Sequence, residues 1–225
     1  MEFETINYRG FDIEIYIGDR FESPREWDNL GTMVYKNRKY ILGDEEIDDP
    51  IEWLESMLGL EPKYEYSNER LAELENIFYR EYIAIPVYKY EHSGITIKAC
   101  SPFGCRFDSG KCGYIYASKE TVRKKFSVKK ISEKLRDQVC QILIDEVKTF
   151  DMYITGEIYS YISEVGSCGG FYGDEGKKQM IEEAKDEIDA HIKNERFNHY
   201  KRVKAFVRNS VPLDKRDPLP VEFSF

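Results

Sequence analysis

YIAIPVYKYEHSGITIKAC, residues 82–100, holds two strand-like segments, 82–90 and 95–100. A third segment, CGYIYA, follows at 112–117. β-branched and aromatic residues dominate all three, which is typical of strands. Upstream, TINYRGFDIEIYI at 5–17 alternates apolar and polar residues around Arg9-Gly10 and predicts a β-hairpin. These segments predict a sheet that is mainly antiparallel.

Helical periodicity predicts three helices, at 68–81, at about 131–153 and from Lys177 to about Asn209. Apolar residues recur at three- and four-residue steps and mark the expected buried faces. In the first helix these are Leu71, Leu74, Ile77 and Phe78; in the second, Ile131, Leu135, Val139, Ile142, Val147 and Phe150; in the third, Met180, Ala184, Ile188, Ile192, Val203 and Phe206.

Two short motifs predict helix starts. Ser23-Pro24-Arg25-Glu26 fits a capping box, with Pro at the first helical position, and Leu30–Tyr35 is expected to continue as a strand. Asp49-Pro50-Ile51-Glu52 repeats the device ahead of WLESMLGL. Asp108-Ser109-Gly110 and GSCGGFYGDEG at 166–176 are expected to form turns.

The order of these elements predicts an α+β fold, with packed helices on a mainly antiparallel sheet. Strands and helices do not alternate regularly enough for a doubly wound sheet. We expect one domain over residues 1–225, with 43–81 as a candidate acidic helical insertion. The Pro-punctuated segment 212–225 is expected to be a surface tail.

The net charge of −9 is unevenly distributed. Residues 1–81 carry 21 Asp and Glu against 9 Lys and Arg, a net of −12, whereas residues 82–225 carry 21 acids against 24 bases, a net of +3. A concentrated field of one sign steers partners of the opposite sign. The asymmetry therefore predicts a basic partner for the N-terminal third.

The acids are densest in DEEIDDPIEWLE at 44–55, which has seven acids and no base. One interpretation is a solvated helix start, where the helix dipole favours acids. The other is a docking surface for a basic protein groove. On the second interpretation the contact residues are Asp44, Glu45, Glu46, Asp48 and Asp49, with Trp53 as an aromatic anchor.

A basic segment offers an alternative. Residues 119–136, KETVRKKFSVKKISEKLR, hold eight Lys and Arg against two Glu. Such a patch either is a solvated helical face or neutralises nucleic-acid phosphates. The phosphate contacts would come from Arg123, Lys124, Lys125, Lys129 and Lys130.

Cysteine and histidine supply a further alternative, an enzyme. His92, Cys100, Cys105 and Cys112 could surround zinc, but their spacings lack the tight Cys pairs of zinc modules. Cys168 could act as a nucleophile with His191 or His199 as base, but the surrounding sequence matches no known cysteine hydrolase. We therefore expect no catalytic residue, no metal and no cofactor.

Several phrases resemble a family of bacteriophage- and plasmid-encoded proteins without an assigned activity. They are YRGFDIEIY, SPREWDNLGTMV, DSGKCGYIYASKETVRKKF, TGEIYSY and GFYGD, and the resemblance spans roughly residues 6–213. It implies a genomic context and no catalytic residues. Accessory proteins of mobile elements often block host defence machinery, such as CRISPR effectors or restriction enzymes, which have basic grooves.

These observations together predict a non-enzymatic inhibitor that binds a host nucleic-acid-processing complex through an acidic surface. The N-terminus, MEFETINYRG, shows no signal peptide, and no apolar run approaches the roughly 18 residues of a membrane span. Five cysteines, an odd number, fit reduced thiols. We expect the protein in the host cytoplasm.

Overall fold

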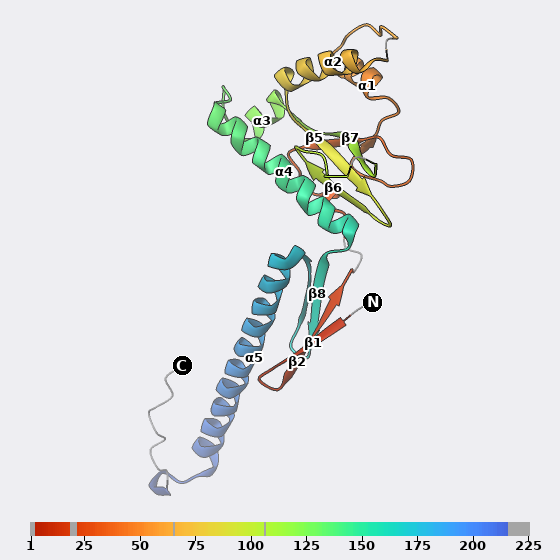
Figure 1. Ribbon diagram of the computed structural model, residues 1–225. Coiled ribbons are helices and arrows are strands. Elements are labelled where there is room, and N and C mark those ends of the chain that lie inside the picture. Colours follow the sequence, from red (N-terminus) through yellow and green to blue (C-terminus); the bar gives the residue numbers. More distant parts are fainter. Residues whose placement is uncertain (1–2, 19–21, 65, 106, 216–225) are drawn as a thin grey trace. The chain divides into compact units, whose positions relative to one another are not determined.

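The computed structural model describes residues 3–18, 22–64, 66–105 and 107–215. The chain divides into two compact units, where the sequence predicted one domain. The first comprises 1–16, 159–171 and 175–225, and the second comprises 17–158 and 172–174. The first unit combines a sheet with one long helix and the second combines a sheet with several helices (Figure 1), which confirms the predicted α+β class.

A five-stranded sheet organises the second unit, in the order β4-β3-β7-β5-β6. All its pairs are antiparallel except β3 with β4. The strands are β3 (Thr32–Tyr35), β4 (Glu45–Glu46), β5 (Tyr82–Glu91), β6 (Ile95–Ala99) and β7 (Ser109–Ser118). The three predicted strands at 82–117 are therefore confirmed, and they lie next to one another.

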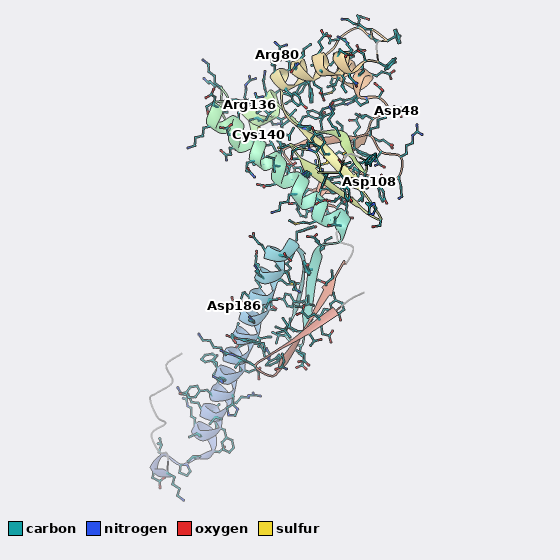
Figure 2. The ribbon with its side chains drawn as sticks, viewed as in Figure 1. Asp48, Arg80, Asp108, Arg136, Cys140 and Asp186 are labelled. Atoms are coloured by element: carbon teal, nitrogen blue, oxygen red, sulfur yellow. The ribbon has the colours of Figure 1, made fainter. Side chains whose placement is uncertain are left out.

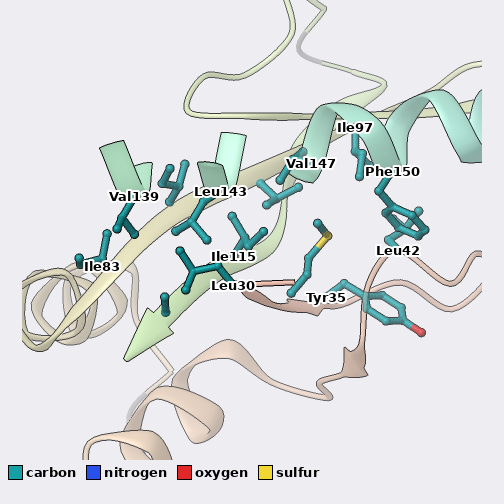
Figure 3. Close-up of a cluster of buried hydrophobic side chains, with 14 of the residues drawn as sticks. Leu30, Tyr35, Leu42, Ile83, Ile97, Ile115, Val139, Leu143, Val147 and Phe150 are labelled. Carbon is teal, nitrogen blue, oxygen red and sulfur yellow. The ribbon is translucent and has the colours of Figure 1, made fainter. Parts of the chain in front are cut away.

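One face of this sheet packs against α4 (Glu133–Thr155). Ser132 caps the helix by accepting from the Leu135 amide at 3.2 Å, and Gly156, with φ of 80°, ends it. Figure 3 shows the α4 side chains meeting those of the strands. The fully buried members include Val139, Leu143, Val147, Ile83 and Ile115.

The other face is covered by α1 (Pro50–Met57) and α2 (Asn68–Glu81). The predicted range of α2 is confirmed, and Leu74 and Phe78 are fully buried. The segment expected as an acidic insertion thus supplies a packed layer of the second unit. Two short helices complete this unit, the 3-10 turn η1 (Pro24–Glu26) and α3 (Lys119–Lys125).

The first unit consists of a four-stranded sheet, β1-β2-β8-β9, and the long helix α5. Its elements are β1 (Phe3–Tyr8), β2 (Phe11–Ile17), β8 (Ile158–Ser163), β9 (Ser167–Tyr172), α5 (Gly173–Ser210) and the 3-10 turn η2 (Leu213–Lys215). The hairpin turn at Arg9-Gly10 has φ of 52° and 91°. Two positive φ values suit the right-handed twist of a tight hairpin.

Three local predictions were wrong. Residues 167–172, expected within a turn, form the edge strand β9, and α5 begins at Gly173. Ser109 and Gly110 are already paired in β7, so that turn ends at Asp108. Val203 and Phe206, expected to be buried, are 37% and 66% exposed.

Among the described residues, the buried part of the apolar stripe of α5 lies in its first half, where Met180, Ala184 and Ile188 pack on Ile13 and Ile15 of β2. Most of the tail expected at 212–225 lies outside the described residues, apart from the exposed turn η2. Within the part of the chain that is described, none of the helices combines the length and apolar character needed to cross a membrane.

Candidate docking surface

Asp44, the first of the predicted docking acids, belongs to a charge network around the buried side chain of Arg25. Arg25 donates from Nε and Nη2 to its carboxylate at 2.9 and 2.7 Å, and from Nη1 to Glu146 at 3.2 Å. The Met33 amide also donates to Asp44, at 2.7 Å. The Arg25 side chain is only 6% exposed. Asp44 therefore fixes η1 against the sheet and α4, and its charge is neutralised internally.

Glu45 and Glu46 form β4 at the edge of the sheet and are both exposed. They pair with Val34 and Tyr35, which pack in the clusters on opposite faces of the sheet. Successive strand residues point to opposite faces, so only Glu45 lies on the side of α1 and α2. The predicted acids thus do not form one continuous patch.

Asp49 and Trp53 have structural roles in α1. Asp49 accepts from the amides of Ile51 and Glu52 at 2.8 and 3.3 Å, which confirms the predicted helix cap. Trp53 contacts three aromatic rings, those of Phe78, Tyr114 and Tyr116, at centroid distances of 5.4, 5.8 and 5.7 Å. The indole is therefore half-buried and packs against the core, and its predicted role as an anchor stays a prediction. Asp48, labelled in Figure 2, is exposed ahead of the cap.

A hollow of about 480 Å³ opens between α1 and the following loop. Three large apolar or aromatic side chains at its rim are exposed: Leu60 by 39%, Tyr64 by 81% and Tyr66 by 57%. Glu52 also lines it, and its carboxylate accepts from the Tyr66 hydroxyl at 2.5 Å. This hydrogen bond is the main reason why the pKa of Tyr66 is raised to about 12. Tyr66 stays protonated and oriented in neutral solution.

A buried ion pair holds the loop against α2. Glu55 accepts from Arg70 Nη2 at 2.7 Å, and both side chains are 3% exposed. The Lys63 amide donates to the same carboxylate oxygen at 3.4 Å. Because the pair joins α1, α2 and the loop, it provides a fixed base for the exposed tyrosines.

We call Glu45, Asp48, Glu52, Glu61, Tyr64 and Tyr66 the acidic aromatic face. Between residues 44 and 69 the sequence has ten acids and one base, Lys63. The sequence predicted the charge but missed the tyrosines, because YEY in a polar loop has no periodicity that reveals exposure. The signal available was local: two Tyr between Pro62 and the cap of α2.

The basic segment spans α3, the following loop and the first turn of α4. Lys125 is paired with Asp28 at 2.6 Å. Arg123, Lys124, Lys129 and Lys130 are exposed, and among the described residues no carboxylate lies within ion-pair distance of them. A second basic region, missed from the sequence, is the distal half of α5.

Residues 193–208 of α5 carry six bases and one acid, Glu195. At 100° per residue, Lys193, Lys201, Lys204 and Arg208 fall on one side of the helix. Lys201 Nζ lies 4.3 Å from the centre of the Phe197 ring, so an aromatic residue is interleaved with the cations.

The cysteines do not assemble a metal site. Cys112 is buried in the core, where its thiol donates to the Val87 carbonyl at 3.5 Å and burial raises its pKa to about 12. Cys105 Sγ lies 3.7 Å from Asp108, which also lies near His92, whereas Cys100 is exposed. In the described segments no three His, Cys, Asp or Glu side chains are placed to hold a metal ion.

Cys168 and the histidines are also separate. Cys168 is exposed, with Sγ 4.0 Å from the neighbouring Gly169 carbonyl, and His191 packs edge-on against Phe11 at 5.9 Å. Within the described residues no hydrogen bond joins Cys168 to His191 or His199.

No protein-family model matches the chain, and comparison with curated proteins and with solved structures gave no significant match. The resemblance to phage- and plasmid-encoded proteins stays a prediction.

Proposed function

We propose that the protein is a non-enzymatic inhibitor that docks onto a basic surface of a host nucleic-acid-processing defence complex through the acidic aromatic face. The observation that carries this proposal is Tyr64. This residue is 81% exposed, and its backbone φ is 53°, in the left-handed region. A non-glycine residue in that region costs roughly 1–2 kcal/mol. Among the described residues no other aromatic ring packs on Tyr64 to offset this cost, whereas burial against a partner would offset it.

The neighbouring groups fit the same role. Tyrosine is enriched among residues that dominate binding energy at interfaces, since it buries a large ring and keeps a hydrogen-bonding hydroxyl. Tyr66 is held by Glu52, so little conformational freedom is lost when a partner binds. The exposed acids of the acidic aromatic face would raise the association rate with a basic partner, an effect that salt weakens.

The nature of the partner follows from charge and from the resemblance described above. Nucleic-acid enzymes carry basic grooves that neutralise phosphates, and an acidic surface is complementary to such a groove. A protein of mobile-element origin that occupies the groove would block CRISPR or restriction machinery without chemistry of its own. It would act in the host cytoplasm.

The test is an affinity capture from bacterial lysate at low and high salt, with the partner identified by mass spectrometry. We expect the wild type to retain a nucleic-acid-processing complex at low salt. The variant Glu45→Lys, Asp48→Lys, Glu61→Lys should lose it, because these exposed acids make no ion pair in the described structure. Tyr64→Asn, which tolerates positive φ, should also weaken capture.

A matched control makes the same charge change elsewhere. Glu164→Lys, Asp186→Lys, Glu195→Lys alters three exposed acids of the first unit and should leave capture intact. If both triple variants lose the partner equally, net charge and not the acidic aromatic face explains binding.

A second candidate function, nucleic-acid binding, is favoured by the clustered bases of 119–136 and of distal α5. We expect retardation of duplex DNA at low salt that disappears as salt rises. Replacing Arg123, Lys124, Lys129 and Lys130 by Gln should reduce this retardation. The further loss on replacing Lys193, Lys201 and Lys204 by Gln measures how much α5 contributes to DNA binding. No retardation at low salt would remove this candidate.

A further inference from the structure

A second hollow, of about 380 Å³, lies where α3, β5 and the start of α4 meet. Four cationic side chains line it: Lys119, Arg123, Lys130 and Arg136. The single carboxylate among its lining residues is Glu133, and the Ser132 hydroxyl also lines it. The lining thus carries a formal charge of +3, whereas the whole chain carries −9.

The backbone around this hollow is fixed. Val122 of α3 is fully buried in the core, and Ser118 caps the helix by accepting from the Thr121 amide at 2.9 Å. After α3 the amides of Ser127 and Val128 donate to the carbonyls of Lys124 and Arg123 at 3.3 and 3.0 Å.

Ser127 has φ of 54°, so the chain leaves α3 through a Schellman turn. That turn folds the loop back beside its own helix, which brings Lys130 next to Arg123 at the hollow.

Two backbone carbonyls orient the side chain of Arg136 at the hollow. Its Nη2 donates to the backbone carbonyls of Tyr79 and Tyr82, at 2.8 and 3.5 Å. These carbonyls orient the half-buried guanidinium and leave its charge without a counter-ion; Figure 2 marks its place on α4. In the described structure, no carboxylate lies within ion-pair distance of Arg123, Lys130 or Arg136.

Two other arginines of this unit, Arg25 and Arg70, have buried side chains that are paired with carboxylates. Arg25 has two carboxylate partners, Asp44 and Glu146, and Arg70 likewise has Glu55 and Glu73. Of the four cations that line the basic hollow, Lys119 alone has a carboxylate partner among the described residues, Glu81, at 3.7 Å. Like charges that share one concave site repel each other, and a bound anion removes that cost.

We propose that this basic hollow binds a phosphate group. Phosphate carries up to two negative charges and several acceptor oxygens, which matches two guanidinium forks, two ammonium groups and a hydroxyl. A single carboxylate would leave most of these donors unused. The phosphate could belong to a nucleic-acid strand or to a free phosphate compound, and the two sources share this chemistry. The site does not depend on the acidic aromatic face.

Thermal unfolding of the full chain tests the proposal, with inorganic phosphate compared with chloride at equal ionic strength. A ligand that binds only the folded state raises the unfolding temperature. We expect phosphate to raise it in the wild type. In Arg123→Gln, Lys130→Gln the apparent phosphate affinity should fall about tenfold or more, because two unpaired cations are lost.

Lys134→Gln, Lys148→Gln is the matched control, because these exposed lysines lie on α4 but do not line the hollow. It should respond to phosphate like the wild type. Circular dichroism of each variant shows that it is folded before the response is measured.

A short single-stranded oligonucleotide, with and without a 5′ phosphate, separates the sources. If the protein binds inorganic phosphate and the 5′-phosphorylated strand but not the strand without a 5′ phosphate, the ligand is a terminal or free phosphate. Binding of both strands, lost in the double variant, assigns a backbone phosphate. If neither probe distinguishes the double variant from the control, the proposal is overturned. The acidic-face triple variant should bind phosphate normally, so failure here and failure of docking are separate results.

Discussion

Arg25→Ala is expected to lower the free energy of unfolding by about 3–5 kcal/mol, the range seen when one partner of a buried ion pair is removed. The guanidinium joins Asp44, Glu146 and the Gly31 carbonyl, the last at 2.6 Å. Without it, two carboxylates are left in a largely buried setting, Glu146 being only 11% exposed. The 3-10 turn η1 would then lose its attachment to α4.

Urea unfolding followed by circular dichroism measures this loss. Lys36→Ala is the control, because the Lys36 ammonium is half exposed and lies 3.8 Å from Asp49. An exposed pair of that kind contributes about 0–1 kcal/mol. Equal midpoints for Arg25→Ala and Lys36→Ala would contradict the structural role given to the Arg25 network.

The second large effect is expected for Gly113→Ala in β7. This residue pairs with Tyr35 of β3 and with Val87 of β5. A Cβ at this position would lie far inside van der Waals contact of the Val34 carbonyl oxygen and 2.9 Å from the Tyr35 Cα. Both obstacles are backbone atoms, so no side chain can turn aside to make room.

We therefore expect Gly113→Ala to cost about 3 kcal/mol or more in unfolding free energy. Gly110→Ala is the control in the same strand, because a Cβ there meets no atom within 4 Å. It should change stability by less than about 1 kcal/mol. If the two variants unfold at the same urea concentration, the close packing of β3 on β7 is not as described.

Local signals in the sequence predicted much of the fold. The cap residues Ser23 and Asp49 and the apolar face of α2 depend on neighbours within four residues, and the structure bears them out. Edge strand β9 was missed because SCGGFY contains two glycines, which are depleted in strands. The conformation of β9 depends on its pairing with β8, and no local sequence pattern predicts that pairing.

The candidate site was less predictable, because a side chain's role depends on what faces it across the fold. Asp44 and Asp48 look alike in the sequence, yet Asp44 forms an ion pair with Arg25 at 2.7 Å, whereas Asp48 makes no ion pair among the described residues. Trp53 is the larger aromatic residue, but it packs against three rings and is half-buried, whereas Tyr64 is 81% exposed. Periodicity failed in α5 too, since the apolar stripe continues to Phe206 beyond the cover of the sheet.

Asp44 also shows why the choice of variant decides the outcome of a docking experiment. Reversing its charge would break the Arg25 network, so lost binding would report unfolding. Glu45, Asp48 and Glu61 have no such role among the described contacts and keep the two effects apart.

The most direct measurement is a calorimetric titration of the purified captured partner with wild-type protein, with Glu45→Lys, Asp48→Lys, Glu61→Lys, and with the matched control triple. We predict that the acidic-face variant binds about tenfold more weakly or worse at low salt, and that the control matches the wild type. Equal affinities for all three proteins would contradict docking through the acidic aromatic face.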